Sequence, residues 1–186
     1  MTDSYLPVMQ KITLISLNNF EPSFIAQVAK TVQLELDFPV ELIEKKIDLN
    51  EYYYPARRQY DGSTLLKVVD SIKPEKSLKS IGLLTVDIFI PILTYIFGQA
   101  YLNGKTGIAS LYRLKNEHYG LKSDDKLLLE RFQKVVIREL GHTFGLKHCY
   151  IPKCVMRSGV YVEDLDQKST NFCPACREAL NIEKKG

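Results

Sequence analysis

The chain has 186 residues, of which 45% are hydrophobic and 25% are charged, with a net charge of +3. This length suits one domain with a sizeable core, and the composition is that of an ordinary globular protein. The near-neutral charge and the dispersed basic residues exclude a continuous phosphate-binding track, so we expect no nucleic-acid partner.

The sequence predicts neither secretion nor membrane insertion. Residues 1–10 have an acid and no basic residue before a broken apolar run, unlike a secretory signal. Residues 81–97 are strongly apolar, but they include Asp87 and Pro91 and fall short of the ~20 residues that a span needs. We therefore expect a cytoplasmic protein with no membrane partner. In a reducing compartment, four cysteines close together favour a metal site over disulfides.

Strands and helices are predicted to alternate along the first 114 residues. The strand segments are bounded by turn residues, and the most apolar one, residues 81–90, is expected at the centre of the sheet. A turn is expected at Asn103-Gly104, and Ser23 is the predicted N-cap of the first helix. The predicted strands are residues 11–17, 40–47, 81–90 and 107–114, and the predicted helices are residues 24–36 and 61–72.

The clearest helix is predicted over residues 124–144. Ser123 is the expected N-cap, and the two aspartates that follow suit the positive end of the helix dipole. Gly145 is placed to end the helix in a left-handed conformation. An apolar stripe at helical spacing is formed by Leu128, Phe132, Val135, Val136 and Leu140.

Alternating strands and helices predict an α/β fold. We expect one domain over residues 1–186. Its sheet and helices, including the long helix of residues 124–144, occupy residues 1–145, and residues 146–186 form a cysteine-rich C-terminal subdomain.

The end of the long helix nearly matches the zinc-peptidase signature H-E-x-x-H-x-x-G-x-x-H. Every fixed letter is present except the first, where Arg138 replaces histidine. The signature places two imidazoles on one helix face, a carboxylate beside them as general base, and a third histidine after a glycine turn. His142 and His148 occupy two ligand positions, and Glu139 occupies the position of the base.

Arg138 changes the chemistry expected of this site. A guanidinium is cationic and has no lone pair for zinc. At ~4 Å and an effective dielectric constant near 20, its repulsion is about 4 kcal/mol per unit of metal charge. Either the two histidines hold zinc weakly, with Glu139 recruited as a ligand, or Arg138 replaces the metal and pairs with Glu139 or another carboxylate of the cleft.

The four cysteines form a second, complete constellation. Two short-spaced pairs, Cys149 with Cys154 and Cys173 with Cys176, use every cysteine of the chain. Four thiolates in two such pairs are typical of a closed tetrahedral zinc site, which contributes directly to folding. Buried unpaired cysteines and a redox Cys-x-x-Cys pair are the alternatives.

At these residues the chain resembles the archaemetzincins, a metzincin-like family of zinc metallopeptidases. Their pattern H-E-x-x-H-x-x-G-x-x-H-C, followed by x4-C-x-M and a later C-x-x-C, is matched from Glu139 to Cys176. Residues 87–100 and 58–60 also resemble the family. Met156 falls where the family has its Met-turn methionine, although the residue alone would pass for an ordinary core methionine.

The resemblance implies a compact α/β metzincin-type domain with a mixed, twisted sheet. It also implies a structural zinc held by the four cysteines and a catalytic zinc held by histidines, with Glu139 as general acid and base and with His142 and His148 as ligands. The first ligand does not carry over to Arg138, so we expect one zinc per chain. His118, in a predicted loop, is read as a surface histidine rather than a substitute ligand.

Three functions remain open. The first is an archaemetzincin homologue with a structural zinc and impaired or lost peptidase activity, which binds a peptide or protein substrate in its cleft. The second is an active zinc peptidase that uses Glu139 with an incomplete histidine site. The third is a zinc-ribbon-like interaction module acting through its cysteine pairs. The sequence predicts neither the substrate nor the oligomeric state.

Overall fold

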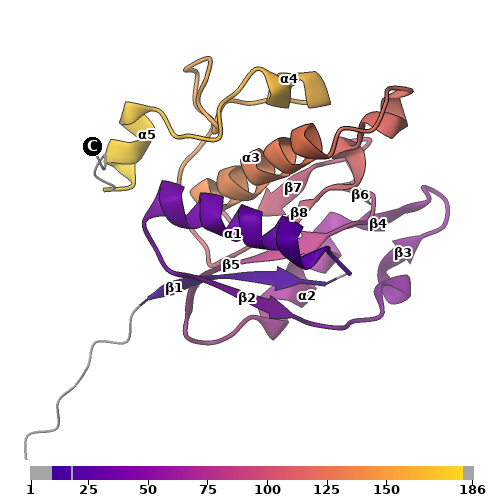
Figure 1. Cartoon of the computed structure of the whole chain (residues 1–186). Coiled ribbons are helices and arrows are strands. Elements are labelled where there is room, and N and C mark those ends of the chain that lie inside the picture. The colour runs from indigo at the N-terminus through magenta and orange to yellow at the C-terminus, as the bar shows by residue number, and fades with distance from the viewer. Residues whose placement is uncertain (1–9, 18, 182–186) are drawn as a thin grey trace, which may run out of the picture.

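The computed structural model of the chain describes residues 10–17 and 19–181, so the expectation for residues 1–10 falls almost wholly outside the described part. Within that part, a mixed five-stranded sheet has the order β2-β1-β5-β8-β7 (Figure 1). The first four strands are parallel, and β7 at the edge is antiparallel to β8. These strands are β1 (Lys11–Ser16), β2 (Val40–Glu44), β5 (Ser77–Leu84), β7 (Gly98–Ala100) and β8 (Thr106–Ser110).

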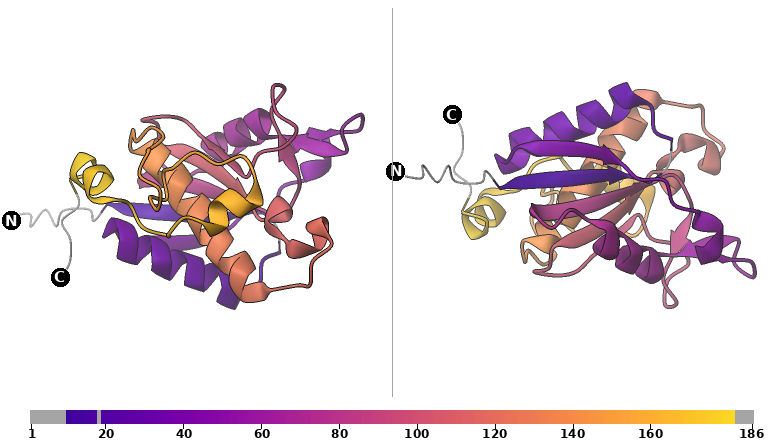
Figure 2. Two further views of the ribbon diagram at one scale, coloured as in Figure 1. Left: turned by 90° about the horizontal axis from the view of Figure 1, so that it is seen from above. Right: turned by 90° about the horizontal axis from the view of Figure 1, so that it is seen from below.

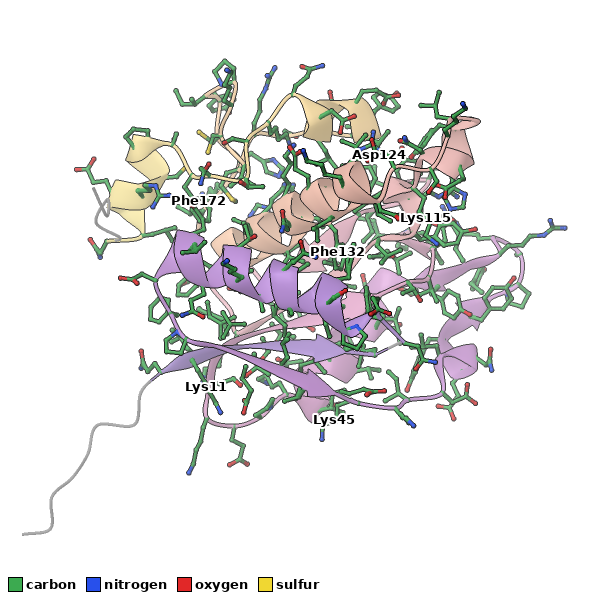
Figure 3. The ribbon with its side chains drawn as sticks, viewed as in Figure 1. Lys11, Lys45, Lys115, Asp124, Phe132 and Phe172 are labelled. Atoms are coloured by element: carbon green, nitrogen blue, oxygen red, sulfur yellow. The ribbon has the colours of Figure 1, made fainter. Side chains whose placement is uncertain are left out.

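Helices cover both faces of this sheet. Helices α1 (Pro22–Leu36) and α3 (Asp125–Thr143) lie on one face, and α2 (Gly62–Ile72) lies on the other (Figures 1 and 2). The larger hydrophobic cluster joins α1 and α3 to the sheet and includes Phe132, seen between these helices in Figure 3. The smaller cluster joins α2 to the opposite face around Leu65 and Val69. The predicted α/β class is confirmed.

A small second sheet and several short helices complete the fold. The second sheet has the order β3-β4-β6. Its strands are β3 (Tyr53–Tyr54), β4 (Gln59–Asp61) and β6 (Ile88–Phe89). The short helices are the 3-10 turns η1 (Leu49–Tyr52), η2 (Tyr112–Leu114) and η3 (Asn116–Tyr119), and the α-helices α4 (Val162–Asp166) and α5 (Pro174–Ala179).

Two predicted helix caps are wrong. Helix α1 begins at Pro22, so Ser23 lies inside it, because the fixed φ of proline suits the first helical position. Helix α3 is capped by Asp124 rather than Ser123, because the Asp124 carboxylate accepts a hydrogen bond from the Leu127 N–H at 2.9 Å.

The predicted strand over residues 81–90 is two strands. Strand β5 starts earlier, at Ser77, and ends at Leu84, while β6 belongs to the second sheet. The central position expected for this segment is correct for β5, which lies third of the five strands. The break lies at Asp87, whose carboxylate is 8% exposed and binds Arg113 rather than continuing the strand.

Candidate functional site

The last turns of α3 carry the signature residues to the edge of the sheet. Arg138 and His142 lie one helical turn apart, so they share a face of the helix. Glu139 is only 1% exposed and lies against β7. A Cβ added to Gly98 would be 2.7 Å from Glu139 Cγ, so the missing side chain allows the strand to approach the carboxylate.

Gly145 turns the chain after α3, as predicted. Its φ of 97° is a left-handed conformation that favours glycine. The Leu146 N–H donates to the Gly141 carbonyl at 2.9 Å and closes the turn. The chain then returns His148 to the side of His142, with 5.4 Å between the ring centroids.

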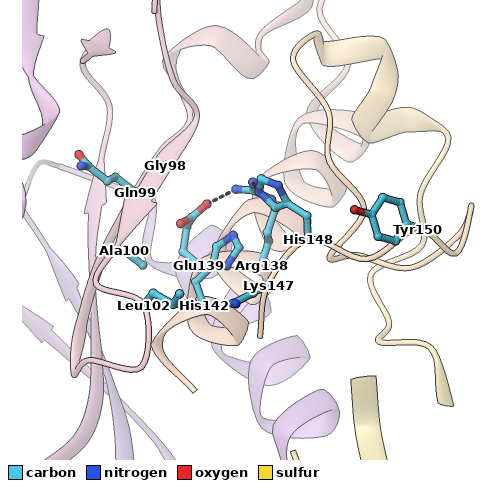
Figure 4. Close-up of a pocket in the computed structure, with 10 residues that line it drawn as sticks. All are labelled: Gly98, Gln99, Ala100, Leu102, Arg138, Glu139, His142, Lys147, His148 and Tyr150. Atoms are coloured by element: carbon cyan, nitrogen blue, oxygen red, sulfur yellow. Dashed lines mark hydrogen bonds and ion pairs between the residues drawn. The ribbon is translucent and has the colours of Figure 1, made fainter. Parts of the chain in front are cut away.

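The Arg138 guanidinium lies between Glu139 and His148 (Figure 4). Its Nη1 donates to Glu139 Oε1 at 2.6 Å, and its Nη2 donates to His148 Nε2 at 2.8 Å. The second bond requires a lone pair on Nε2, so the neutral His148 ring carries its proton on Nδ1. The ion pair with Glu139 is one of the two pairings predicted for Arg138.

His142 is held by the turn that follows it. Its Nδ1 lies 2.7 Å from the Leu146 carbonyl oxygen, which only accepts, so Nδ1–H is the donor. The lone pair of the neutral ring is then on Nε2. A backbone carbonyl orients metal-binding histidines in the same way.

Burial and Arg138 set the charges at this site. Burial raises the pKa of Glu139 above its usual range, and the adjacent Arg138 works against that rise. Burial, and then repulsion from Arg138, lower the pKa of both His142 and His148. Both imidazoles are therefore neutral at pH 7.

Two cavities meet at Arg138. The larger, about 660 Å³, is lined by residues of β7 and by Glu139, His142 and Lys147. The smaller, about 270 Å³, continues toward residues 90–97 and 158–160. Both are lined by Gly98, Gln99, Arg138 and His148, so they form one cleft along β7 with the guanidinium at its middle.

A catalytic zinc does not fit the residues of this cleft. A three-ligand zinc site needs free lone pairs directed at one point. Here the Nε2 lone pair of His148 and an oxygen of Glu139 accept hydrogen bonds from Arg138, which is itself a cation. Only His142 keeps a ring lone pair free of Arg138.

The four cysteines do fit a zinc ion. Their Sγ atoms all lie within 4.8 Å of one another, and two pairs, Cys149–Cys173 and Cys154–Cys176, are 3.7 Å apart. These separations are far longer than a disulfide bond. They match the roughly 3.8 Å between sulfurs in a tetrahedron whose metal–sulfur bonds are about 2.3 Å. In the described part of the chain, no other group of three or more His, Cys, Asp or Glu side chains is close enough to share a metal.

The cysteine cluster is joined to the cleft through Met156 and the backbone. The Cys149 N–H donates to the Met156 carbonyl at 3.0 Å, and Cys149 directly follows His148. The Met156 side chain is fully buried. It packs under α3, where a Cβ on Gly141 would be 2.5 Å from its Sδ. A methionine therefore supports the helix beneath the cleft, where the resemblance places one.

The site residues named from the sequence fall into two groups. Arg138, Glu139, His142 and His148 meet in the cleft, and the four cysteines meet behind it. His118 joins neither group: it lies in η3 with its ring 4.3 Å from that of Tyr112.

Sequence reasoning missed the opposite wall of the cleft. Gly98, Gln99 and Ala100 form β7, which is too short for an alternating apolar pattern. It also missed Lys168, a 5% exposed lysine whose pKa is lowered to about 8, first by burial and then by Arg138. The available signal for β7 was the turn at residues 103–104, since a strand before it completes a hairpin.

The described helices include none that is both long and apolar enough to cross a membrane.

Comparison with known proteins gives concordant matches. The model of peptidase family M54 matches residues 8–182. An archaemetzincin of Sulfolobus acidocaldarius is 37% identical over 179 residues, covering 95% of this chain and 99% of the relative. The crystal structure of archaemetzincin from Methanopyrus kandleri is 33% identical, with a TM-score of 0.81 over 92% of this chain and 93% of that one. A zinc-dependent peptidase from Methanocorpusculum labreanum is 30% identical, with a TM-score of 0.79 over 91% of this chain and 100% of that one.

Proposed function

Since this chain belongs to peptidase family M54, the family of the archaemetzincins, we propose that it is a homologue in which peptidase activity is impaired or lost. In this proposal the protein keeps a structural zinc and binds peptides in its cleft. The observation that carries it is the position of the Arg138 guanidinium, which bonds both Glu139 and His148.

Arg138 acts on each part of the catalytic machinery. It supplies a positive charge where the family signature has a ligand, which opposes a dication. It occupies the lone pair that His148 would give a metal. It also engages Glu139 Oε1 in an ion pair at 2.6 Å, and pairing with a cation makes the carboxylate a weaker base toward water. A catalytic zinc would supply an activated water, and this site does not support that chemistry.

The cysteine cluster supports a structural zinc. Cys149, Cys154, Cys173 and Cys176 would hold the ion in a closed site that leaves no position for a substrate. Such an ion stabilises the fold and carries out no reaction. Thiolate ligands also support a cytoplasmic protein, since reducing compartments keep cysteines as thiols.

The cleft supports peptide binding. Its larger cavity, about 660 Å³, has the size of a ligand pocket. Strand β7 runs along it and is one of the two edge strands of the main sheet. An edge strand offers backbone groups to which an extended peptide can pair.

An active peptidase is the second candidate. Two observations favour it: Glu139 is buried and its pKa is raised, as in many general bases, and His142 is oriented like a metal ligand. For this candidate to hold, purified protein must show a peptidase activity that Glu139→Ala abolishes and that a zinc chelator removes.

Metal content tests the proposed function directly. We expect purified wild-type protein to contain one zinc per chain, and Arg138→His to contain two, because the exchange restores a third imidazole and removes the cation. Inductively coupled plasma mass spectrometry after dialysis measures the ratio.

The matched control is Arg58→His, the same exchange at an exposed position away from the cleft. Arg58→His should still contain one zinc per chain. Two zinc ions in the wild-type protein would rule out the proposal, and a ratio of one in Arg138→His would show that Arg138 is not what excludes the metal.

A further inference from the structure

Basic side chains outnumber acidic ones around the larger cavity of the cleft. Of the residues that line the larger cavity, Arg138 and Lys147 are basic and Glu139 is acidic. Glu139 is 1% exposed and its charge is already paired with Arg138. Lys147 is exposed at the rim, so the open surface of this cavity is cationic.

The Arg138 guanidinium has N–H donors that its contacts with Glu139 and His148 do not use. It carries five N–H groups, and its contacts with Glu139 and His148 use two of them. The Arg138 side chain is 21% exposed, and it lines both cavities. An incoming carboxylate would find a planar, already positioned donor group, and such groups bind carboxylates strongly.

Apolar side chains surround this cation. Leu102 is 52% exposed and Tyr150 is 96% exposed on the side of the larger cavity. Leu93 is 45% exposed and Val160 is 62% exposed on the side of the smaller one. Exposed apolar groups around a polar centre mark a surface that binds a ligand with apolar parts, more than a bare inorganic anion.

Resting on the proposed peptide-binding function, we propose that the cleft recognises the C-terminal end of a peptide, whose free α-carboxylate binds the guanidinium of Arg138 with support from Lys147. The last residues of the peptide lie along β7 in the larger cavity, with an apolar side chain near Leu102 and Tyr150. A peptide amino terminus is excluded from the same point, because its ammonium group would meet Arg138 while Glu139 is buried and paired.

A matched pair of peptides tests this assignment. The probes are N-acetyl-Ala-Ala-Leu as the free acid and the same tripeptide as its C-terminal amide, measured by isothermal titration calorimetry. We expect wild-type protein to bind the acid at least ten times more tightly than the amide, with the difference shrinking as salt is raised. Arg138→Gln should bind both peptides about equally.

Two controls keep the result interpretable. Arg58→Gln makes the same exchange at an exposed position outside the cleft and should keep the full preference for the acid. Arg138→Gln should retain one zinc per chain and an unchanged circular dichroism spectrum, which shows that it folds. Sodium acetate should bind far more weakly than the tripeptide acid.

Several outcomes would overturn the inference. These are equal binding of acid and amide by the wild type, a preference that survives in Arg138→Gln, acetate binding as tightly as the tripeptide, or binding of neither peptide. The zinc count of wild type and Arg138→His involves no peptide. Failure here with a confirmed zinc count therefore removes the carboxylate assignment and leaves the impaired peptidase with one structural zinc standing, whereas two zinc ions in the wild type remove the proposed function itself.

Discussion

Gly98 allows β7 to lie directly against α3 at the cleft. A Cβ at this position would lie 2.7 Å from the Ile108 carbonyl oxygen and 2.7 Å from Glu139 Cγ. Real side chains do not approach backbone atoms so closely, and neither the β7–β8 ladder nor α3 can move without losing buried contacts. The strand and the helix are therefore adjacent because this residue has no side chain.

We expect Gly98→Ala to destabilise the protein by about 1–3 kcal/mol, the usual cost of overpacking. The same substitution should weaken the contact between Arg138 and Glu139, because it displaces the carboxylate. Urea denaturation followed by circular dichroism measures the stability. If the urea midpoint of Gly98→Ala equals that of the wild type, β7 and α3 can move apart at little cost in stability.

Lys168 gives the stability of the protein a pH dependence. It is 5% exposed, and its Nζ donates to the Arg157 carbonyl. Burial and the charge of Arg138 lower its pKa from 10.5 to about 8. Between these two pH values the unfolded chain binds a proton that the folded chain does not, so the free energy of unfolding rises with pH across this window.

The rise attributable to Lys168 should be of order 2–3 kcal/mol between pH 8 and pH 10.5. Lys168→Met keeps the length of the side chain and removes the titrating group, so the variant should lack this part of the rise. Denaturation curves of both proteins at several pH values supply the comparison. If the free energy of unfolding rises equally with pH in the two proteins, Lys168 is solvated when it is charged.

At the scale of elements, the end of α3 and the loop after it are held from behind by the cysteine cluster. Met156 accepts a hydrogen bond from the Cys149 N–H at 3.0 Å, and Val155 donates to the Asn171 carbonyl at 3.0 Å. Without a metal, four buried or half-buried thiols would have to stay together through weak contacts alone. We therefore expect the position of His148 to depend on a metal ion bound by the four cysteines.

Removal of this zinc should loosen the cleft before it unfolds the sheet. An ion present at a thousand times its dissociation constant adds about 4 kcal/mol of stability. For a protein of this size, its loss should lower the Tm by roughly 8–16 °C. Cys154→Ser or a strong chelator should also speed hydrogen exchange in residues 146–160, while β1 and β5 stay protected.

Differential scanning calorimetry and hydrogen exchange measure these effects, and zinc added back to chelated wild-type protein should reverse them. If exchange rises equally in β1 and β5, the metal supports the whole fold rather than the wall of the cleft.

The elements that the sequence predicted well were those with strong periodicity. The stripe from Leu128 to Leu140 identified α3, and the apolar run after residue 81 identified the central strand. Short pieces were not predictable, because β6 and β7 have two and three residues and owe their conformation to neighbouring strands. The cap errors have two causes: Pro22 starts α1 one residue before the predicted serine cap, and Asp124 caps α3 in place of the serine beside it.

The site was predictable as a set of residues but not as a set of contacts. Spacing within one helix and one turn is fixed by local geometry, so Arg138, Glu139 and His142 could be placed together. The bond from Arg138 to His148 depends on the path of the loop after Gly145, which local rules do not determine. Likewise, nothing local placed Gly98 against Glu139, since 40 residues of chain lie between them.

At the scale of the whole molecule, one buried carboxylate joins the C-terminal segment to the first helix. Glu35 of α1 is 4% exposed. It accepts hydrogen bonds from the Phe172 N–H at 2.7 Å and from Asn171 Nδ2 at 2.8 Å, and it pairs with Arg177 at 2.6 Å. The left view of Figure 2 shows the yellow C-terminal segment passing over α3. These polar contacts therefore bind the end of the cysteine-rich segment to the main body.

The order of the cysteines along the chain also fixes when the cleft is completed. Cys149 directly follows His148. It can contact Cys173 only after the ribosome has added 24 more residues. At the usual speed of synthesis, this interval lasts roughly 1–5 s, during which earlier parts of the chain can already fold. The cysteine cluster behind His148 can form only after Cys173 and Cys176 have been synthesised. We therefore expect a nascent chain to form its sheet and α3 first, and to complete the cysteine site and the cleft only after residue 176 has been made.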